Sequence, residues 1–305
     1  MKLELRNIQK SFSGKEVLHG ISFSVESGRA LGLLGRNGAG KTTTIRIIMD
    51  VFKANAGTIT LDGRPFVPRE HQIGYLPEER GLYPKKKVGE QLIYLAMLRG
   101  MDARAAKDSA HKWLKRLEVE EYFDRKLETL SKGNQQKVQL AQTLVCDPEL
   151  VILDEPFSGL DPVNSQILKD VIQEVIARGK MVIFSSHQMG YVEEFCEDIV
   201  IIHHGDVVLN GNLDEIKKEK SRGRLQVSCR GLNSEALAGR LAKELSGMVA
   251  VEKILKDEVV VCLKEGSHAN GMLRNMMDAG LELESFGRYE PSLNDIFVES
   301  AGDEA

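Results

Sequence analysis

A glycine-rich segment, residues 35–42, has the residue types and spacing of a phosphate-binding loop. Glycines let the backbone wrap an anion so that successive N–H groups point toward it, and a helix starting directly after the loop adds the positive end of its dipole. Lys41 would reach the β- and γ-phosphates of a nucleoside triphosphate, and the Thr42 hydroxyl would bind Mg²⁺. A turn with a purely structural role is the weaker alternative, since the segment follows a buried apolar run. The predicted nucleotide-binding residues are Gly35, Arg36, Asn37, Gly38, Ala39, Gly40, Lys41, Thr42 and Thr43.

Three more candidate residues follow short apolar runs. Asp154 and Glu155 come after residues 150–153, and His187 comes after residues 181–186. Ligands of open α/β sheets bind at the carboxyl ends of the strands, so these side chains are expected beside the phosphate-binding loop. Asp154 would help to hold Mg²⁺, and Glu155 would orient and deprotonate an attacking water. An acidic turn without a function is the alternative reading of the acid pair.

Hydrophobic patterns predict the elements that position these residues. Uninterrupted apolar runs separated by helical stretches indicate strands buried on both faces, and hence a parallel α/β core. Period-two alternation indicates antiparallel strands with one exposed face, and residues 88–145 are helix-rich. The predicted core strands are 30–34, 150–153 and 181–184, the predicted antiparallel strands are 3–8, 21–25 and 58–62, and the predicted helices are 88–99, 105–117 and 134–144.

Charge and length indicate two domains. The chain has 305 residues, and residues 224–305 carry nine basic and fourteen acidic residues, whereas the remainder is close to neutral. A charged run at residues 217–224 marks either a linker or a solvated helix end followed by a turn. We therefore expect a larger domain at 1–220, which contains the phosphate-binding loop and a helical subdomain at about 88–145, and a small α+β domain at 224–305.

The predicted elements of the C-terminal domain alternate between strands and helices, and no catalytic constellation is evident in its sequence. A regulatory or dimer-supporting role is expected for it. The predicted strands are 225–229, 249–254, 258–263 and 281–284, and the predicted helices are 234–245 and 270–277.

Composition excludes several classes of protein. The net charge of −4 argues against a general nucleic-acid binder, which usually has an excess of basic residues. The four cysteines are scattered without C-x-x-C spacing, which argues against a zinc site or a disulfide framework. No apolar run approaches the ~20 residues needed to span a bilayer, and the charged N-terminus does not read as a signal peptide. We therefore expect a cytoplasmic location.

Further segments resemble the nucleotide-binding subunit of ABC transporters. Residues 130–137, Leu-Ser-Lys-Gly-Asn-Gln-Gln-Lys, resemble the family signature, and they precede Asp154 by about the family's spacing. Residues 158–161 resemble the D-loop, residues 185–187 the switch-histidine segment, and residues 73–78 the Q-loop. The resemblance covers residues 1 to about 220 in order, and the tail at 290–299 is similar to ATPases of the drug- and sodium-export branch.

This resemblance implies the fold and the site. The fold would be the P-loop NTPase of ABC type, with a parallel core sheet, an antiparallel β subdomain and a helical subdomain. Phe12 would stack on adenine, and His187 would hold the γ-phosphate. Two subunits would pair head to tail around ATP, each offering the D-loop residue Asp161 and a signature helix capped by Ser131, whose positive end faces the γ-phosphate. The residues acting on the partner's nucleotide would be Ser131, Lys132, Gly133 and Asn134.

The sequence departs from the family pattern at three positions. Lys132 and Asn134 replace the usual Gly and Gln of the signature, and Glu78 replaces the usual Gln of the Q-loop. Lys132 would either attract phosphate or crowd the start of the helix. Glu78 would still bind Mg²⁺, together with Thr42 and Asp154, but it adds negative charge beside the phosphates. An asymmetric dimer with a different partner subunit is one explanation.

The expected function is that of an ATP-hydrolysing subunit, with ATP and Mg²⁺ as cofactors, that powers export through a separate transmembrane permease. Its partners would be a second ATP-binding subunit, identical or different, and the permease, which would hold the protein at the cytoplasmic face of the membrane. Residues 79–88, which combine aromatic and basic side chains, would either meet the permease or form a solvated loop with exposed lysines. The alternatives are a soluble ABC-type ATPase and a nucleotide-dependent regulator.

Overall fold

A six-stranded sheet forms the centre of the larger part of the chain. The computed structural model describes residues 1–79 and 81–302. In space the strands follow the order β10-β9-β3-β8-β7-β6, with β3, β6, β7, β8 and β9 parallel and β10 antiparallel. The three central strands are buried along their whole length, as their uninterrupted apolar sequences require. The strands are β3 (Ala30–Leu34), β6 (Ile73–Leu76), β7 (Leu150–Asp154), β8 (Met181–Ser185), β9 (Asp198–His203) and β10 (Asp206–Asn212).

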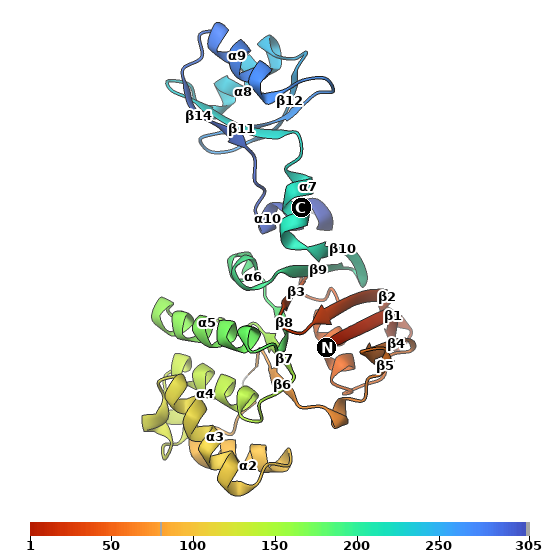
Figure 1. Ribbon diagram of the computed structural model, residues 1–305, viewed down its shortest axis with the longest axis vertical. Helices are drawn as coiled ribbons and strands as arrows, with labels where there is room; N and C mark the ends of the chain where they lie inside the picture. Colours follow the sequence, from red (N-terminus) through yellow and green to blue (C-terminus); the bar gives the residue numbers. More distant parts are fainter. Residues whose placement is uncertain (80, 303–305) are drawn as a thin grey trace. The chain divides into compact units, whose positions relative to one another are not determined.

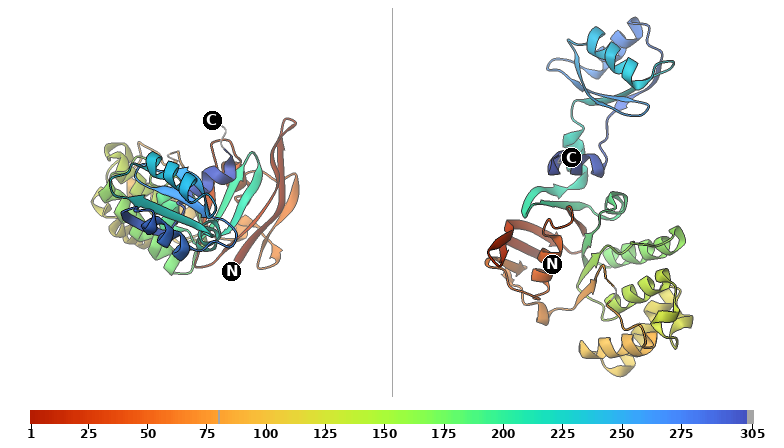
Figure 2. Two further views of the ribbon diagram at one scale, coloured as in Figure 1. Left: turned by 90° about the horizontal axis from the view of Figure 1, so that it is seen from above. Right: turned by 180° about the vertical axis from the view of Figure 1, so that it is seen from behind.

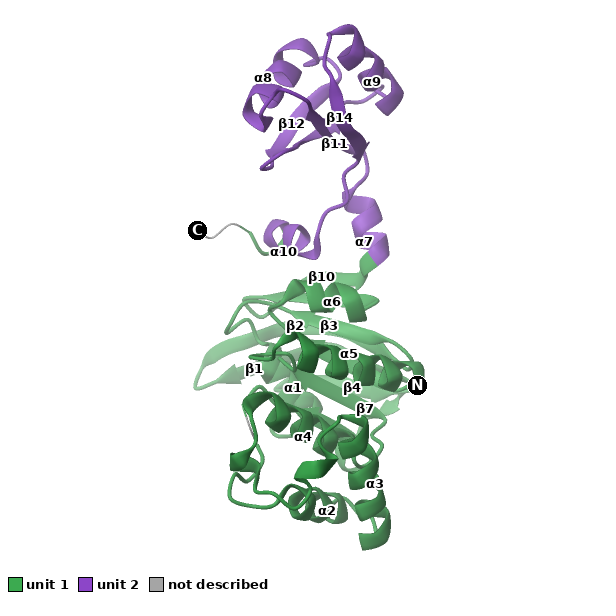
Figure 3. Ribbon diagram, turned by 90° about the vertical axis from the view of Figure 1, so that its left-hand side faces the viewer, with its two compact units in different colours: residues 1–213, 300–305 green, residues 214–299 purple. Residues whose placement is uncertain are grey.

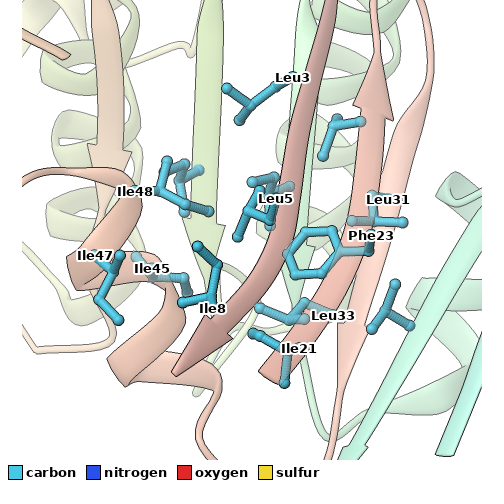
Figure 4. Packing of buried hydrophobic residues seen from close by; sticks show 14 of the residues in the cluster. Leu3, Leu5, Ile8, Ile21, Phe23, Leu31, Leu33, Ile45, Ile47 and Ile48 are labelled. Atoms are coloured by element: carbon cyan, nitrogen blue, oxygen red, sulfur yellow. The ribbon is translucent and has the colours of Figure 1, made fainter. Parts of the chain in front are cut away.

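A second sheet, in the order β2-β1-β4-β5, is antiparallel. Burial alternates along parts of β1 and β2 and is interrupted by register shifts in their pairing, and the buried side chains pack onto α1 and the parallel sheet (Figure 4). Leu3, Leu5, Phe23 and Leu33 belong to this core and are at most 5% exposed. The elements are β1 (Lys2–Phe12), β2 (Lys15–Glu26), α1 (Lys41–Ile48), β4 (Ala56–Leu61) and β5 (Arg64–Pro65), followed by the 3₁₀ turn Pro68–Glu70.

Helices group into a separate lobe between β6 and β7. In Figure 1, α2, α3 and α4 gather on the side of the parallel sheet away from β1 and β2, and the rear view in Figure 2 shows the same separation. Asp102 caps α3, because its carboxylate accepts hydrogen bonds from the backbone N–H groups of Arg104 and Ala105. The helices of the lobe are α2 (Val88–Leu98), α3 (Ala103–Arg116) and α4 (Lys132–Leu144), with 3₁₀ turns at Glu120–Tyr122 and Leu127–Thr129. Two further helices, α5 (Pro162–Ala177) and α6 (Met189–Phe195), follow β7 and β8.

The chain divides into two compact units, coloured separately in Figure 3. The first comprises Met1–Leu213 and Ser300–Ala305, and the second comprises Asp214–Glu299. The division thus falls before residues 217–224, the segment expected to separate the domains. That segment ends α7 (Leu213–Lys220) and turns into β11, which corresponds to the solvated helix end and turn.

The second unit is an antiparallel sheet in the order β12-β13-β11-β14 with helices packed against it. Leu237 and Leu241 of α8 and Met272 and Met276 of α9 are at most 1% exposed within this core. The elements are β11 (Arg224–Cys229), α8 (Ser234–Glu244), β12 (Val249–Ile254), β13 (Val259–Leu263), α9 (Ala269–Asp278), β14 (Leu283–Arg288) and α10 (Leu293–Ala301).

Most predicted elements are present, with shifted ends. The strand expected at 281–284 is displaced to Leu283–Arg288, because β14 takes its register from pairing with β11. The pair β9 and β10 and the helix α10 were not predicted from the sequence. Across the described residues, no helix is both long enough and apolar enough to cross a membrane.

Candidate nucleotide-binding site

A pocket of about 540 Å³ opens where the phosphate-binding loop meets the carboxyl ends of the parallel strands. The loop connects β3 to α1, the acid pair ends β7, and His187 and Glu78 follow β8 and β6. Segments far apart in the sequence therefore converge, as the predicted parallel sheet requires. The lining residues are Val17, Gly35, Arg36, Asn37, Gly38, Gly40, Lys41, Thr42, Thr43, Glu78, Asp154, Glu155 and His187.

The loop is pre-shaped for an anion. Gly40, the N-cap of α1, has a φ of 116°, and a Cβ there would lie 2.5 Å from Leu18 Cδ2, so only glycine fits. The Lys41 ammonium donates to the carbonyl oxygens of Gly35 at 2.6 Å and Arg36 at 3.3 Å. Burial lowers the pKa of Lys41, and the negative charges of Glu155, Asp154 and Glu78 oppose that shift. The lysine therefore stands among acids at the start of a helix, where phosphate oxygens are favoured.

Asp154 is 6% exposed at the last position of β7. Burial is the main cause of its raised pKa, and the charges of Glu78 and Glu155 act in the same direction, whereas a Ser185 hydrogen bond and the Lys41 charge oppose it. A nearby cation would stabilise the ionised form of a carboxylate that is buried beside two other acids. That is the electrostatic property expected of a metal ligand.

Glu155 is held by the segment that carries His187. Its carboxylate accepts hydrogen bonds from the backbone N–H of His187 at 2.7 Å and from Ser186 Oγ at 3.1 Å, and His187 Nδ1 lies 2.8 Å from Oε1. Glu155 has a φ of 50°, which is uncommon outside glycine, and its backbone N–H donates to Ser185 O at 2.9 Å. The carboxylate is 7% exposed, whereas the His187 side chain is 68% exposed. The glutamate is thus fixed, and the histidine imidazole is accessible.

Two predicted groups lie outside the lining of this pocket. Phe12, at the end of β1, is 42% exposed and packs edge-on against Phe52, with a centroid separation of 5.2 Å. Its stacking on adenine stays a prediction. Ala39 lies within the loop but is buried. The signature residues Ser131, Lys132, Gly133 and Asn134 and the D-loop residue Asp161 are also absent from the lining, so their action on a second subunit's nucleotide is likewise untested.

The start of the signature helix α4 lies close to the start of α5, the helix that follows the D-loop. Ser131 Oγ accepts from the Asn134 backbone N–H at 3.3 Å and caps α4, as expected. Asp161 caps α5 by accepting from the Asn164 backbone N–H at 2.9 Å, and it also accepts from Asn164 Nδ2. A Cβ on Gly133 would lie 2.8 Å from that same Nδ2, so the glycine lets the two helix starts approach closely.

Polar residues of α4 that the sequence reasoning missed connect it to the pocket. Gln136 Nε2 donates to Pro156 O at 3.0 Å, directly after the acid pair. Gln139 Nε2 makes longer contacts with the carbonyl oxygens of Pro77, at 3.5 Å, and Glu79, at 3.3 Å, on either side of Glu78. Thr143 Oγ1 donates to Tyr75 O at 3.2 Å. Their spacing on one helical face was the available signal.

The residues predicted to bind Mg²⁺ fit this cation chemically. Thr42, Asp154 and Glu78 offer hard oxygen donors on one pocket, which is the ligand type that Mg²⁺ prefers. Over residues 1–79 and 81–302, no cluster of three or more His, Cys, Asp or Glu is arranged to hold a metal by itself. This agrees with the usual mode of Mg²⁺ binding, in which one or two carboxylates act together with substrate phosphates.

Comparison with known proteins identifies the family. The profile of a family described as ABC transporter matches residues 18–158, and that of a family described as ATP-binding protein DrrA1-3-like, C-terminal domain, matches residues 211–301. An uncharacterized ABC transporter ATP-binding protein of Bacillus subtilis is 40% identical over 306 residues, covering 98% of this chain and 98% of that protein. The chain belongs to the ABC transporter ATP-binding proteins.

Two further similarities agree with this assignment. A Nod factor export ATP-binding protein I of Burkholderia lata is 35% identical over 213 residues, covering 68% of this chain and 70% of that protein. A solved structure described as the ATP binding subunit of an ABC transporter is 30% identical, covers 80% of this chain and 100% of that chain, and has a TM-score of 0.67. The predicted ABC-type fold of this ABC ATP-binding protein is therefore confirmed, and with it ATP as the expected ligand of the pocket.

Proposed function

We propose that this ABC ATP-binding protein hydrolyses ATP as a dimer and drives export through a separate membrane-spanning permease. The observation that carries the proposal is the fixed Glu155 carboxylate, which lies on the pocket of the phosphate-binding loop and 2.8 Å from the accessible His187. The name of the Burkholderia relative, which refers to export, supports that direction of transport. The substrate would be selected by the permease.

Each pocket residue has a role in this mechanism. The loop N–H groups and Lys41 bind the β- and γ-phosphates, and the dipole of α1 favours their charge. Thr42, Asp154 and Glu78 would hold Mg²⁺, which supplies charge neutralisation at the phosphates when bound. Glu155 accepts the proton of the attacking water, and His187 holds the γ-phosphate in register with it. Phe12 supports the adenine.

The dimer would place the signature of one subunit over the nucleotide of the other. The starts of α4 and α5 carry Ser131 and Asp161, and the Gly133–Asn164 approach keeps these two elements together. In the dimer, the capped N-terminus of α4 would offer its dipole to the γ-phosphate, and Lys132 would add a positive charge. Loss of that phosphate on hydrolysis would release the contact.

An exposed apolar surface supports docking of a membrane partner. Tyr94, Met97 and Leu98 lie one turn apart on α2 and are 57%, 47% and 65% exposed. Tyr83 is 59% exposed, and its backbone N–H donates to Gln91 Oε1 at 3.0 Å, which fastens the preceding loop to α2. Of the segment predicted to meet the permease, residue 80 lies outside the described residues. Aromatic and apolar side chains gathered in this way are typical of a protein interface.

The dimer is tested with the variant Glu155→Gln. Binding should survive while water activation fails, so the variant should accumulate as an ATP-bound dimer. Light scattering after size exclusion, with and without Mg²⁺-ATP, should show a doubled mass only in its presence. An unchanged mass would contradict the dimer mechanism.

The permease is tested by co-purification from membranes. A multi-spanning membrane protein should accompany the wild-type chain, and Leu98→Glu should lose it while keeping ATP binding. Glu118→Gln, a substitution elsewhere on the helical lobe, is the control and should retain the partner. Hydrolysis without any membrane partner would favour the soluble ATPase instead. Nucleotide binding without turnover would favour the regulator.

The residues that line the pocket all belong to the first unit. We assign Asp214–Glu299 to regulation or dimer support. Its own helices and sheet bury a separate apolar core, so it is built as an accessory domain.

A further inference from the structure

The pocket that receives the phosphates is lined by more acids than permanent cations. Glu78, Asp154 and Glu155 line it together with Arg36 and Lys41. A nucleoside triphosphate is itself a polyanion, so each of these carboxylates opposes the approach of a nucleotide that carries no metal. Asp154 and Glu155 have roles in metal binding and catalysis. Glu78, which would hold Mg²⁺ together with Asp154, brings the third negative charge to the pocket.

The charge of Glu78 affects the pKa values of three neighbouring groups: Lys41, Asp154 and Tyr75. It opposes the burial-induced lowering of the Lys41 pKa, and it adds to the raised pKa of Asp154 that burial mainly causes. Burial, with the charges of Asp154 and Glu78, also raises the pKa of Tyr75 to about 12 against the opposing charge of Arg46. The Glu78 carboxylate therefore acts on the interior of the pocket, although the residue itself is exposed.

The fold holds Glu78 at this position. β6 runs parallel to β7, with Leu76 opposite Leu153, so Glu78 leaves the sheet beside the acid pair. The Gln139 amide contacts the carbonyl oxygens of both residues that flank Glu78, and Thr143 bonds Tyr75 one turn further along α4. These contacts hold the backbone on both sides of Glu78, so moving that backbone away from an incoming phosphate would break them. Repulsion is therefore not simply relieved by a shift of the loop.

We propose that Glu78 makes the pocket reject ATP that carries no divalent cation, so that nucleotide is accepted as its metal complex. This inference rests on the proposed ATP-binding function. A bound divalent cation removes two charges from the triphosphate and attracts Glu78, whereas metal-free ATP meets its full repulsion. The carboxylate thus acts as a selectivity element for the charge state of the nucleotide.

The test is a comparison of ATP affinities by isothermal titration, in excess Mg²⁺ and in EDTA. Glu78→Gln removes the charge, Glu78→Asp keeps it, and Glu79→Gln removes an adjacent exposed charge that does not line the pocket. We expect Glu78→Gln to bind metal-free ATP on the order of tenfold more tightly than wild type, from the loss of one nearby unit charge. Its affinity for Mg²⁺-ATP should not rise, because the same change removes a carboxylate that would hold the cation.

The controls distinguish a failure of the Glu78 proposal from a failure of the proposed ATP-binding function. Glu78→Asp and Glu79→Gln should retain the wild-type preference for Mg²⁺-ATP, and added salt should narrow the difference between wild type and Glu78→Gln. An unchanged affinity of Glu78→Gln in EDTA, an equal gain in both conditions, or the same gain in Glu79→Gln would overturn the role of Glu78 alone. Wild-type protein that fails to bind Mg²⁺-ATP would overturn the proposed function and this inference with it.

Discussion

Each of the two units contains a cluster of charged side chains, and the clusters are built in opposite ways. In the first unit, three acids and Lys41 line the pocket, and the ammonium donates to backbone carbonyls. In the second unit, Glu299 is surrounded by Lys220, Arg224 and Lys253, with N···O distances of 3.0–3.4 Å. We call these four residues the Glu299 cluster.

The two clusters also differ in backbone conformation. The pocket depends on positive φ angles at Gly40 and Glu155, whereas the Glu299 cluster stands on the regular elements α7, β11, β12 and α10. Strained backbone and charges that face a cavity are typical of a binding site. Side chains that neutralise one another on regular elements are typical of a structural ion-pair network.

The largest effect is expected for Glu155→Gln. If Glu155 is the general base, the rate of ATP hydrolysis should fall by about 10²–10⁴-fold while ATP affinity is retained. Steady-state phosphate release and titration with ATP measure the two quantities. Glu70→Gln, an exposed substitution on the same unit, should leave both unchanged. Full activity of Glu155→Gln would contradict the role of Glu155 as general base, and with it the contrast between a catalytic pocket and a structural ion-pair network.

Lys41→Ala should act on binding instead. Loss of a charge-assisted contact to the phosphates should weaken ATP binding by ~10- to 100-fold. Fluorescence titration with a nucleotide analogue measures this affinity, and Lys107→Ala on the exposed face of α3 is the matched control. Equal affinities in the two variants would show that the pocket is not the nucleotide site.

Gly133→Ala should disturb packing within the first unit. The added Cβ would lie 2.8 Å from Asn164 Nδ2, and the Asp161 contact restrains that side chain, so we expect a loss of about 1–2 kcal/mol. Trp113, the single tryptophan, lies in the first unit, and its fluorescence reports the urea unfolding of that unit alone. Asn164→Ala removes the amide that the new Cβ would meet and keeps a helix-forming residue, so adding it to Gly133→Ala should cost less than the sum of the two single changes. Additive costs would show that the approach of the two helix starts is not the cause.

Glu299→Gln should destabilise the second unit by about 1 kcal/mol at neutral pH, a typical value for a network of partly exposed ion pairs. Burial raises the pKa of Glu299, but hydrogen bonds from Lys253 and Lys220 and the charges of Lys253 and Arg224 lower it overall, below its ordinary value of 4.5. Because the pKa of Glu299 is lower in the folded state, its ionised carboxylate stabilises the fold at pH values above the ordinary pKa of the group. This stabilisation is lost as the pH falls through the folded-state pKa.

The readout for that variant separates the two units. At pH 7, far-UV circular dichroism should show an unfolding transition of Glu299→Gln at a lower urea concentration than in wild type. The transition reported by Trp113 fluorescence should keep its wild-type midpoint. The difference from wild type should shrink in acid. Arg230→Gln breaks a pair whose side chains are 76% and 68% exposed and should have almost no effect. A shift of the Trp113 transition in Glu299→Gln would contradict the independence of the two clusters.

Local sequence patterns predicted much of the fold. Uninterrupted apolar runs predicted β3, β7 and β8, and alternation predicted β1, β2 and β4, because these patterns follow from burial on two faces or on one. Ser131 as a helix cap was read correctly, since capping depends on nearby residues. The register of β14 was not predicted, because it depends on pairing with β11, which is distant in the sequence. The helix α10 had a local signal that was not used: Ser292 and Asp295 each accept a hydrogen bond from the other's backbone N–H at its start.

The sequence by itself determined which residue types are present and which local shapes they favour: a loop that suits phosphate, an acid pair at the end of a strand, and two differently charged regions. Only the tertiary structure decided their mutual arrangement. It placed His187 against Glu155, Glu78 on the wall of the same pocket, and the polar face of α4 across the backbone that carries them. The physical reason is that local conformation depends on neighbouring residues, whereas electrostatic and hydrogen-bonding relations depend on distances that only sheet pairing and helix packing set.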